Sequence, residues 1–236
     1  MGGGHMEAMI LDKTTDALGV VRMQMRGGER ARALETLDAD AESLETAHGP
    51  EAALVHGLVR HLEGQSATAR PLLRRGVAAR AETHAWRSDR ALGLFLLARQ
   101  GRGIALLRRV CREAQADAMD FGRLAALLIQ IGRLDEAEDA LIEALNREPE
   151  RVEWLSNLGG LRARQGRYDE ALAQYERALA LDPENTKIRD LRDRMLVVLD
   201  QPDRVVRERE SEVKNHPRHV DPLVRLARAH DQAEEP

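Results

Sequence analysis

The feature that most constrains the fold is the stretch 152–185, which reads as two short amphipathic helices joined by a glycine. Helices are predicted over about 153–165 and 168–181, because apolar residues recur at three- and four-residue spacing in both. Gly166 separates them, and Pro183 ends the second, because the residue before a proline is pushed out of the helical region. A helix pair this short cannot bury its own apolar stripe, so it predicts neighbours of the same kind.

The spacing of small residues indicates where those neighbours lie. Five positions recur at an offset of 34 residues, and five recur at 102, which is three periods of 34. The first set is Gly132, Ala137, Leu141, Ala144 and Pro149, which precede Gly166, Ala171, Tyr175, Ala178 and Pro183; the second is Gly57, Gly64, Ala69, Leu73 and Gly76, which precede Gly159, Gly166, Ala171, Tyr175 and Ala178. Self-similarity at such a period is typical of a helical repeat array.

The same residues resemble the tetratricopeptide repeat (TPR) family. Its signature positions are matched by Leu158, Gly159, Gly166, Tyr168, Ala171, Tyr175, Ala178 and Pro183. Two positions depart from the pattern, since Trp154 is one residue early and Arg162 replaces the usual tyrosine. The resemblance implies an all-α fold, a right-handed superhelical solenoid of antiparallel helix pairs. It is specific over 118–185 and weaker over about 14–81 and 186–233.

The chain divides into six predicted segments. They are 1–6, a cloning remnant; 7–81, degenerate N-terminal repeats that include one helix over 29–47; 82–117, an irregular helix pair; 118–185, two well-formed repeats; 186–219, a divergent repeat; and 220–236, a terminal or truncated half-repeat. In 82–117 one helix is predicted from Trp86 to Gln100, ended by Gly101 about three residues later than the period requires. A boundary between two half-arrays is the alternative interpretation of that segment. We expect the native chain to continue beyond Pro236, with a polar terminal cap as the alternative.

Composition excludes several classes of protein. The net charge is −4, with 32% charged residues, so the chain as a whole lacks the basic footprint of a nucleic-acid binder. Cys111 is the single cysteine, so no intrachain disulfide can form and a reducing compartment is expected. No apolar run approaches the ~18–20 residues of a membrane span. We predict a cytoplasmic protein, with a removed signal sequence as the open alternative, and the arginine and alanine bias suggests a GC-rich bacterial coding sequence.

The sequence offers no catalytic, cofactor or metal motif. It contains no P-loop, no G-x-G-x-x-G after a strand, no H-E-x-x-H and no C-x-x-C, so we predict that the protein is not an enzyme and needs no cofactor. Cys111 is interpreted as a small core residue. His216 and His219 are interpreted as a solvated turn, because a zinc site needs a third and fourth ligand.

One candidate binding surface comes from the resemblance, which implies that the first helix of each repeat lines a concave groove that holds peptides of partner proteins. The groove residues predicted here are Ile129, Gln130, Ser156, Gly160, Arg164, Asp190, Arg194 and Arg228. Among them Arg164, Arg194 and Arg228 form a hypothetical ladder for an acidic segment or a C-terminal carboxylate. The alternative is that these arginines only make the surface soluble.

The predicted function is therefore a non-enzymatic scaffold that binds a protein or peptide partner along the concave groove. No nucleic acid and no membrane span are expected. One alternative is the repeat region of a larger bacterial enzyme, such as a transferase, whose catalytic domain lies beyond Pro236. Another is a self-assembling repeat protein that forms homo-oligomers.

Overall fold

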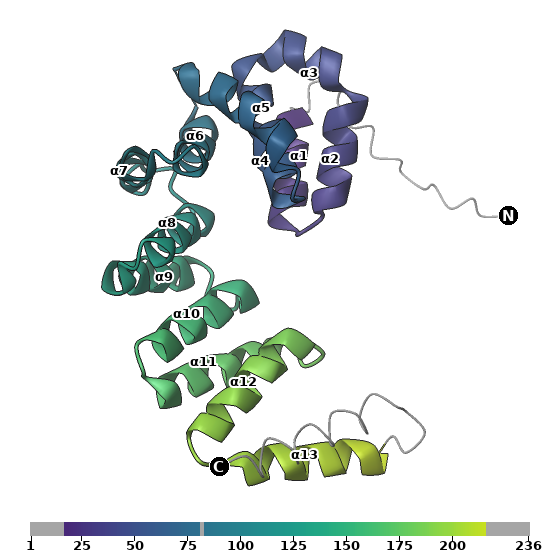
Figure 1. Ribbon diagram of the computed structural model, residues 1–236, viewed down its shortest axis with the longest axis vertical. Coiled ribbons are helices and arrows are strands. Elements are labelled where there is room, and N and C mark those ends of the chain that lie inside the picture. The colour runs from purple at the N-terminus through teal and green to yellow at the C-terminus, as the bar shows by residue number, and fades with distance from the viewer. Residues whose placement is uncertain (1–16, 81–82, 216–236) are drawn as a thin grey trace, which may run out of the picture. The chain divides into compact units, whose positions relative to one another are not determined.

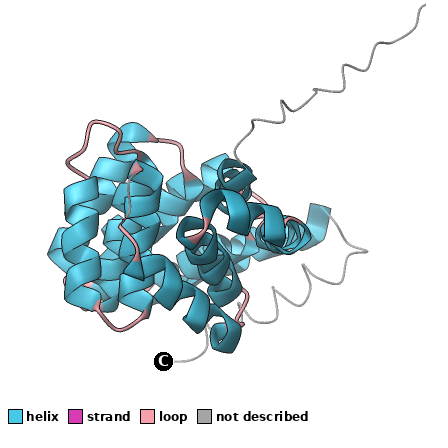
Figure 2. Ribbon diagram, turned by 90° about the horizontal axis from the view of Figure 1, so that it is seen from above, coloured by secondary structure: helices cyan, strands magenta, loops and turns pink. Residues whose placement is uncertain are grey.

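The computed structural model describes residues 17–80 and 83–215, and this part of the chain consists of helices joined by short turns, without any strand (Figure 1 and Figure 2). It forms two compact units, the first ending at Ala116 and the second beginning at Asp117. The predicted all-α stack of helix pairs is confirmed. The six predicted segment boundaries stay a prediction, and 1–16 and 216–236 lie outside the described residues.

Seven helices make up the described part of the first unit. They are α1 (Ala17–Arg26), α2 (Arg30–Ala39), α3 (Ala41–His48), α4 (Pro50–Leu62), α5 (Ser66–Ala78), α6 (His84–Leu96) and α7 (Gln100–Val110). The helices α4 and α5 form one tightly packed pair and α6 and α7 another, while α1 packs against α2. Their apolar stripes meet in two clusters, one around Leu37 and Val59 and one around Leu54 and Leu73.

Six helices make up the described part of the second unit. They are α8 (Ala118–Gln130), α9 (Leu134–Arg147), α10 (Val152–Arg164), α11 (Tyr168–Leu181), α12 (Thr186–Val198) and α13 (Pro202–Asn215). Each consecutive pair packs together, and α10 also contacts α12, so first helices of successive repeats are neighbours. The two helices predicted within 152–185 are confirmed as α10 and α11.

The turn inside each pair recurs every 34 residues without interruption. The residue in the left-handed backbone region is Gly64, Ala98, Gly132, Gly166 or Asp200. After each of them the next residue donates its N–H to a carbonyl five positions earlier, as Arg99 does to Leu94 at 2.9 Å. This bond is typical of a Schellman helix end, where glycine is preferred because it lacks a Cβ.

The turn between α6 and α7 corrects two sequence-based predictions. The helix expected to reach Gln100 ends at Leu96, and the turn is made at Ala98 rather than at Gly101. Gly101 lies inside α7. The apparent lateness of this turn came from treating glycine as its marker, whereas Ala98 keeps the 34-residue phase with a φ of +61°.

The single helix predicted over 29–47 is also wrong, because it is divided into α2 and α3 at Asp40. The backbone of Asp40, at φ −108° and ψ 19°, is not helical. Its N–H donates to Thr36 at 3.2 Å and its carbonyl accepts from Leu44 at 2.8 Å. The bend lets Leu37 of α2 and Leu44 of α3 both enter the core around α4.

Close packing within a pair depends on a small residue facing a large one. A Cβ added at Gly159 of α10 would lie 2.8 Å from the Tyr175 ring of α11, closer than packed carbon atoms come. A Cβ at Gly122 of α8 would lie 2.3 Å from the Trp154 indole, which explains how a tryptophan one residue early is accommodated. Trp154 and Tyr175 are among the largest fully buried side chains.

The divergent pair α12 and α13 replaces this small-to-large contact with an ion pair. Asp193 follows Gly159 by 34 residues and Arg209 follows Tyr175 by 34. Both are buried, and Arg209 Nη2 donates to Asp193 Oδ2 at 2.6 Å. The other oxygen, Oδ1, accepts from Arg192 at 2.9 and 2.6 Å. The repeat therefore keeps its geometry with polar groups that satisfy each other.

Candidate functional site

The predicted groove residues of the second unit lie on the first helices α8, α10 and α12. Residues four apart on a helix share a face, so Ser156, Gly160 and Arg164 form one stripe on α10. Asp190 and Arg194 form the corresponding stripe on α12. These stripes are half-buried or exposed, whereas the opposite face of α10 is buried. The pattern is that of helix faces left open to solvent by the repeat packing.

The position of the remaining groove residues differs between α8 and the end of the chain. Ile129 is half-buried and Gln130 is exposed, both at the C-terminal end of α8. Arg228 lies outside the described residues. The contact between α10 and α12 brings two of the three stripes onto neighbouring helices. Convergence of all eight residues on one ligand stays a prediction.

Charged side chains of the groove stripes are available for a ligand. Arg164, Asp190 and Arg194 are exposed, and none forms an ion pair or side-chain hydrogen bond with another described residue. Arginines that serve the fold differ, as Arg162 shows: its Nε lies 3.2 Å from Glu138 Oε1 on α9. Position within the repeat therefore separates structural arginines from available ones.

Glu138 is the centre of a polar cluster that joins α9 to the next repeat. It accepts from Arg162 at 3.2 Å and from Arg167 at 2.6 Å, and Arg167 also binds Glu170 through two bonds of 2.6 Å. Burial raises the pKa of the Glu138 carboxyl, but the bonds to Arg167 and Arg162 outweigh it and lower that pKa below its usual value. Arg162, which replaces the tyrosine of the family pattern, thus serves inter-repeat packing.

One groove feature was missed by the sequence analysis, which placed Tyr175 only in the core. A Cβ added at Gly160 would lie 3.5 Å from the Tyr175 hydroxyl oxygen, so the phenol reaches through α10 to the open face. The absence of a side chain at both Gly159 and Gly160 makes this possible. The adjacent glycines were the available signal, since two consecutive residues without Cβ expose the backbone and whatever lies beneath.

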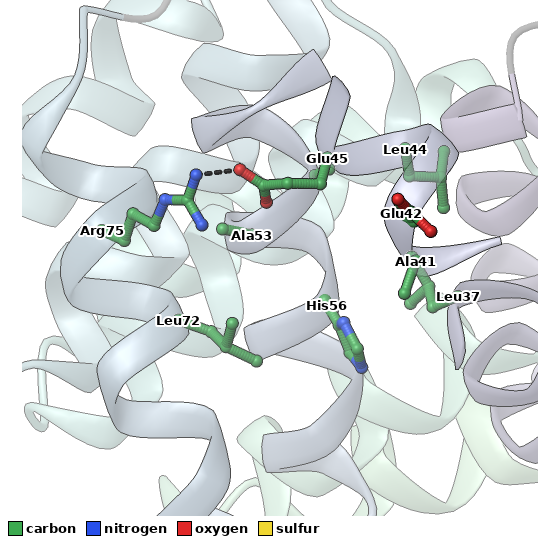
Figure 3. A pocket seen from close by; sticks show the side chains of 10 residues that line it. Leu37, Ala41, Glu42, Leu44, Glu45, Ala53, His56, Leu72 and Arg75 are labelled. Atoms are coloured by element: carbon green, nitrogen blue, oxygen red, sulfur yellow. Dashed lines mark hydrogen bonds and ion pairs between the residues drawn. The ribbon is translucent and has the colours of Figure 1, made fainter. Parts of the chain in front are cut away.

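The first unit has a pocket of about 410 Å³ on α4 (Figure 3). Its floor is Ala52, Ala53 and His56 of α4, and its walls come from α2, α3 and α5. Glu45 of α3 and Arg75 of α5 meet across it in an ion pair (Figure 3). Its lining is mostly aliphatic, without a nucleophile, so the pocket is a packing gap between helices rather than a reaction site.

His56 is the titratable residue of that pocket. Its Nε2 lies 2.7 Å from Arg60 Nε and 3.0 Å from Asp38 Oδ1. Burial and then the charge of Arg60 lower the pKa of His56 below its ordinary 6.5, while Asp38 acts in the opposite direction. The neutral imidazole therefore accepts a hydrogen bond from Arg60, which is a structural role.

The residues considered for chemistry do not assemble into a reaction centre. Among residues 17–80 and 83–215 no three His, Cys, Asp or Glu side chains are grouped as metal ligands. Cys111 is half-buried just after α7 instead of on its buried face. His216 and His219 lie outside the described residues. No described helix is long and apolar enough to cross a membrane.

Comparisons with known proteins identify the repeat. Residues 123–186 match the family model for the tetratricopeptide repeat. This region covers α9 and α10–α11 with most of α8, the best-preserved pairs of the array. A comparison with curated protein sequences gives no match.

Solved structures share the arrangement of helix pairs. The thermophilic TPR protein TTC0263 of Thermus thermophilus is 22% identical, with a TM-score of 0.60 over 77% of this chain and 97% of that one. The pilF protein of Pseudomonas aeruginosa is 14% identical, with 0.58 over 90% and 96%. A chain of the Cut9–Hcn1 hetero-tetramer of the APC/C is 16% identical, with 0.60 over 90% of this chain and 42% of that one. Together with the family match over 123–186, this shared fold shows that the chain is a tetratricopeptide-repeat protein.

Proposed function

We propose that this protein is a non-catalytic scaffold that holds an acidic peptide segment of a partner protein along α8, α10 and α12. TPR proteins are generally protein-interaction scaffolds, which supports the class of function. The observation that carries the proposal is the pair of open stripes, Ser156–Gly160–Arg164 and Asp190–Arg194, on neighbouring first helices.

The chemistry of the stripes favours a peptide ligand. Ser156 and Gly160 are small, so an extended chain can approach the helix backbone closely at these positions. The Tyr175 hydroxyl beside Gly160 supplies a donor and acceptor for a peptide group. At the ends of the stripes Arg164 and Arg194 present guanidinium groups, which bind carboxylates through two parallel hydrogen bonds. The ligand is therefore expected to carry Asp, Glu or a free C-terminal carboxylate.

A peptide-binding measurement tests the proposal. The probe is a fluorescein-labelled peptide of about ten residues, rich in glutamate and with a free C-terminal carboxylate, followed by fluorescence anisotropy. The variant combines Arg164→Glu, Arg194→Glu and Arg228→Glu. We expect about a tenfold or greater loss of affinity, and a weaker dependence of binding on salt, because the attractive charges are reversed.

A matched variant controls for the change in net charge. Arg30→Glu, Arg207→Glu and Lys214→Glu reverse three exposed charges that form no ion pair with another described side chain. These residues lie on α2 and α13, away from the groove stripes. Equal affinity losses in both variants, or unchanged binding in the groove variant, would contradict a site on the first helices.

The alternatives drawn from the sequence stay predictions. For the larger-enzyme alternative, the full open reading frame is the test, and a stop codon soon after Pro236 would end that idea. For self-assembly, light scattering over a dilution series is the test, and a monomer at all concentrations would exclude it.

A further inference from the structure

The basic residues of this acidic chain are concentrated in one segment. Residues 66–116 contain eleven arginines, no lysine and three carboxylates, in a chain whose net charge is −4. Two of those carboxylates are engaged: Asp89 binds Arg22 at 2.8 Å, and Glu113 binds Arg87 at 2.6 Å. Glu82, the third, lies outside the described residues. The segment α5–α7 therefore carries a large local excess of positive charge.

Three of these arginines form a row on the outer side of α7. Arg102 and Arg109 lie on the helix and Arg112 in the turn after it, at helical spacing of seven and three residues. All three are exposed, as is Ala105 between them. Together Arg102, Arg109 and Arg112 are called the α7 arginine face below. Ten residues of helix at 1.5 Å each give the row a length of about 15 Å.

The α7 arginine face lies opposite the face that packs on the rest of the unit. The buried residues of α7 are Gly103, Ile104, Leu107 and Val110, which pack toward α6. At 100° per residue the arginines fall on the other side of the helix axis. In Figure 1 α6 and α7 lie side by side, in agreement with their packing as a pair. The arginines thus point away from α6.

These arginines lack the local partners that exposed arginines have elsewhere in the chain. Arg147 pairs with Glu143 four residues away, and Arg167 with Glu170 three residues away. Around α7 the carboxylate at such a distance is Glu113, four residues after Arg109, and it is held by Arg87 and His84. No ion pair joins the α7 arginine face to another described residue.

We propose that the α7 arginine face binds an acidic helix of a partner protein, at a surface separate from the first-helix groove. Glutamates three, four and seven residues apart on such a helix would form a row that matches the three guanidinium groups. Charge complementarity carries this choice, because the face offers several donors and no carboxylate that neutralises them. Surface pairs are weak singly, so the row acts through several of them together.

The observations favour a protein segment over a nucleic acid. A nucleic-acid surface combines a long positive track with aromatic side chains on which bases stack. Here the row is about 15 Å long, and aromatic residues are 3% of the chain. The chain as a whole is acidic, which repels a long polyanion beyond the row.

The test compares two probes on the full chain. The first is an N-acetylated, C-amidated, fluorescein-labelled helical peptide of about 14 residues with glutamates on one face, and the second is a single-stranded DNA of about 20 nucleotides. The test variant is Arg102→Glu/Arg109→Glu, and the matched control is Arg30→Glu/Arg207→Glu, which changes the net charge equally. Arg102→Gln/Arg109→Gln is a milder second variant, and circular dichroism shows that each is folded.

We expect the peptide to bind the unaltered chain and the control equally, with about a tenfold loss in the test variant and a smaller loss in the glutamine variant. The groove variant Arg164→Glu/Arg194→Glu should bind this peptide normally, because the peptide has no free carboxyl terminus and binds elsewhere. Three results would overturn the proposal: no peptide binding, equal loss in test and control variants, or DNA bound more tightly than peptide with loss in the test variant. Loss in the groove variant alone would assign the peptide to the first-helix groove and reject the α7 arginine face.

Discussion

At the scale of single residues, the left-handed turn positions are where sequence and geometry conflict. Ala98 and Asp200 adopt φ values of +61° and +59° at positions that elsewhere hold glycine. A Cβ in this region costs roughly 1–2 kcal/mol, and aspartate tolerates it better than alanine does. The helix pairs on either side are packed well enough to hold Ala98 in this conformation.

Replacing Ala98 with glycine should therefore stabilise the first unit. We expect a gain of up to about 1 kcal/mol in the free energy of unfolding, since relief of the Cβ clash exceeds the added entropy of the unfolded chain. Urea denaturation measures this as a higher midpoint. Ala105→Gly in the exposed interior of α7 is the control and should lose roughly 1 kcal/mol. A lower midpoint for Ala98→Gly would show that the turn is not strained.

His56 should make the stability of the first unit depend on pH. Its folded pKa lies below the ordinary 6.5, so the unfolded chain binds a proton more readily than the folded one. The contribution of the neutral histidine is fully present above pH 6.5 and is lost as the pH falls below it toward the folded pKa. His56→Gln keeps an acceptor for Arg60 and should reduce this loss, measured as urea midpoints at about pH 7.5 and pH 5. An unchanged pH dependence would contradict this role.

Single residues also show how far the sequence predicts the site. The face of each first helix follows from its period, so Ser156, Gly160 and Arg164 could be placed on one stripe beforehand. The Tyr175 hydroxyl could not, because its reach to the groove depends on how closely α11 packs against Gly159. Glycine also misled at Gly101, since the turn position is set by the repeat length and not by the residue that fits it best.

At the scale of helices, the pair α12–α13 shows that a repeat can exchange apolar packing for a buried ion pair. Asp193 and Arg209 occupy positions that hold Ala125 and Leu141 two repeats earlier. The cost of burying two charges is offset by their mutual attraction and by the bonds from Arg192 to Asp193. Such a pair contributes little net stability but is sensitive to loss of one partner.

A double-mutant cycle should reveal this asymmetry. Asp193→Ala leaves Arg209 buried without its carboxylate and should lower the free energy of unfolding by about 3–5 kcal/mol, and Arg209→Leu should do likewise. The double variant Asp193→Ala/Arg209→Leu restores the small-to-large pair and should be neutral or more stable by about 1–4 kcal/mol. Chemical denaturation of all four proteins gives the coupling energy. Additive losses in the double variant would mean that the two side chains do not depend on each other.

Helix boundaries were predictable where the local pattern and the packing agreed. In α10 and α11 the apolar spacing, Gly166 and Pro183 all indicate the same pair, and the structure has it. Over 29–47 the apolar spacing is continuous, yet the chain bends at Asp40 so that α2 and α3 both reach α4. That bend arises from tertiary packing, which a local pattern does not contain.

At the scale of the whole molecule, contacts connect helices that are near in sequence. Within each unit the well-packed neighbours are the two helices of a pair and the helices of the next pair. The stability of such an array is approximately a sum of repeat terms and nearest-neighbour terms. Damage to one repeat should therefore spread to its neighbours and weaken with distance along the chain.

Hydrogen exchange can follow this spread from two reciprocal core substitutions. Tyr175→Ala empties a site lined by Leu155, Ala178 and Ile188 on three successive helices of the second unit. A loss of about 3 kcal/mol corresponds to roughly a hundredfold faster exchange through local opening. We expect this in α10–α12, with exchange in α4 and α5 unchanged. Leu54→Ala in the first unit, where Leu54 packs with Leu73, should give the converse pattern. Equal acceleration of both units by either substitution would mean that the chain unfolds as one cooperative body, because only global opening exposes distant helices at the same rate.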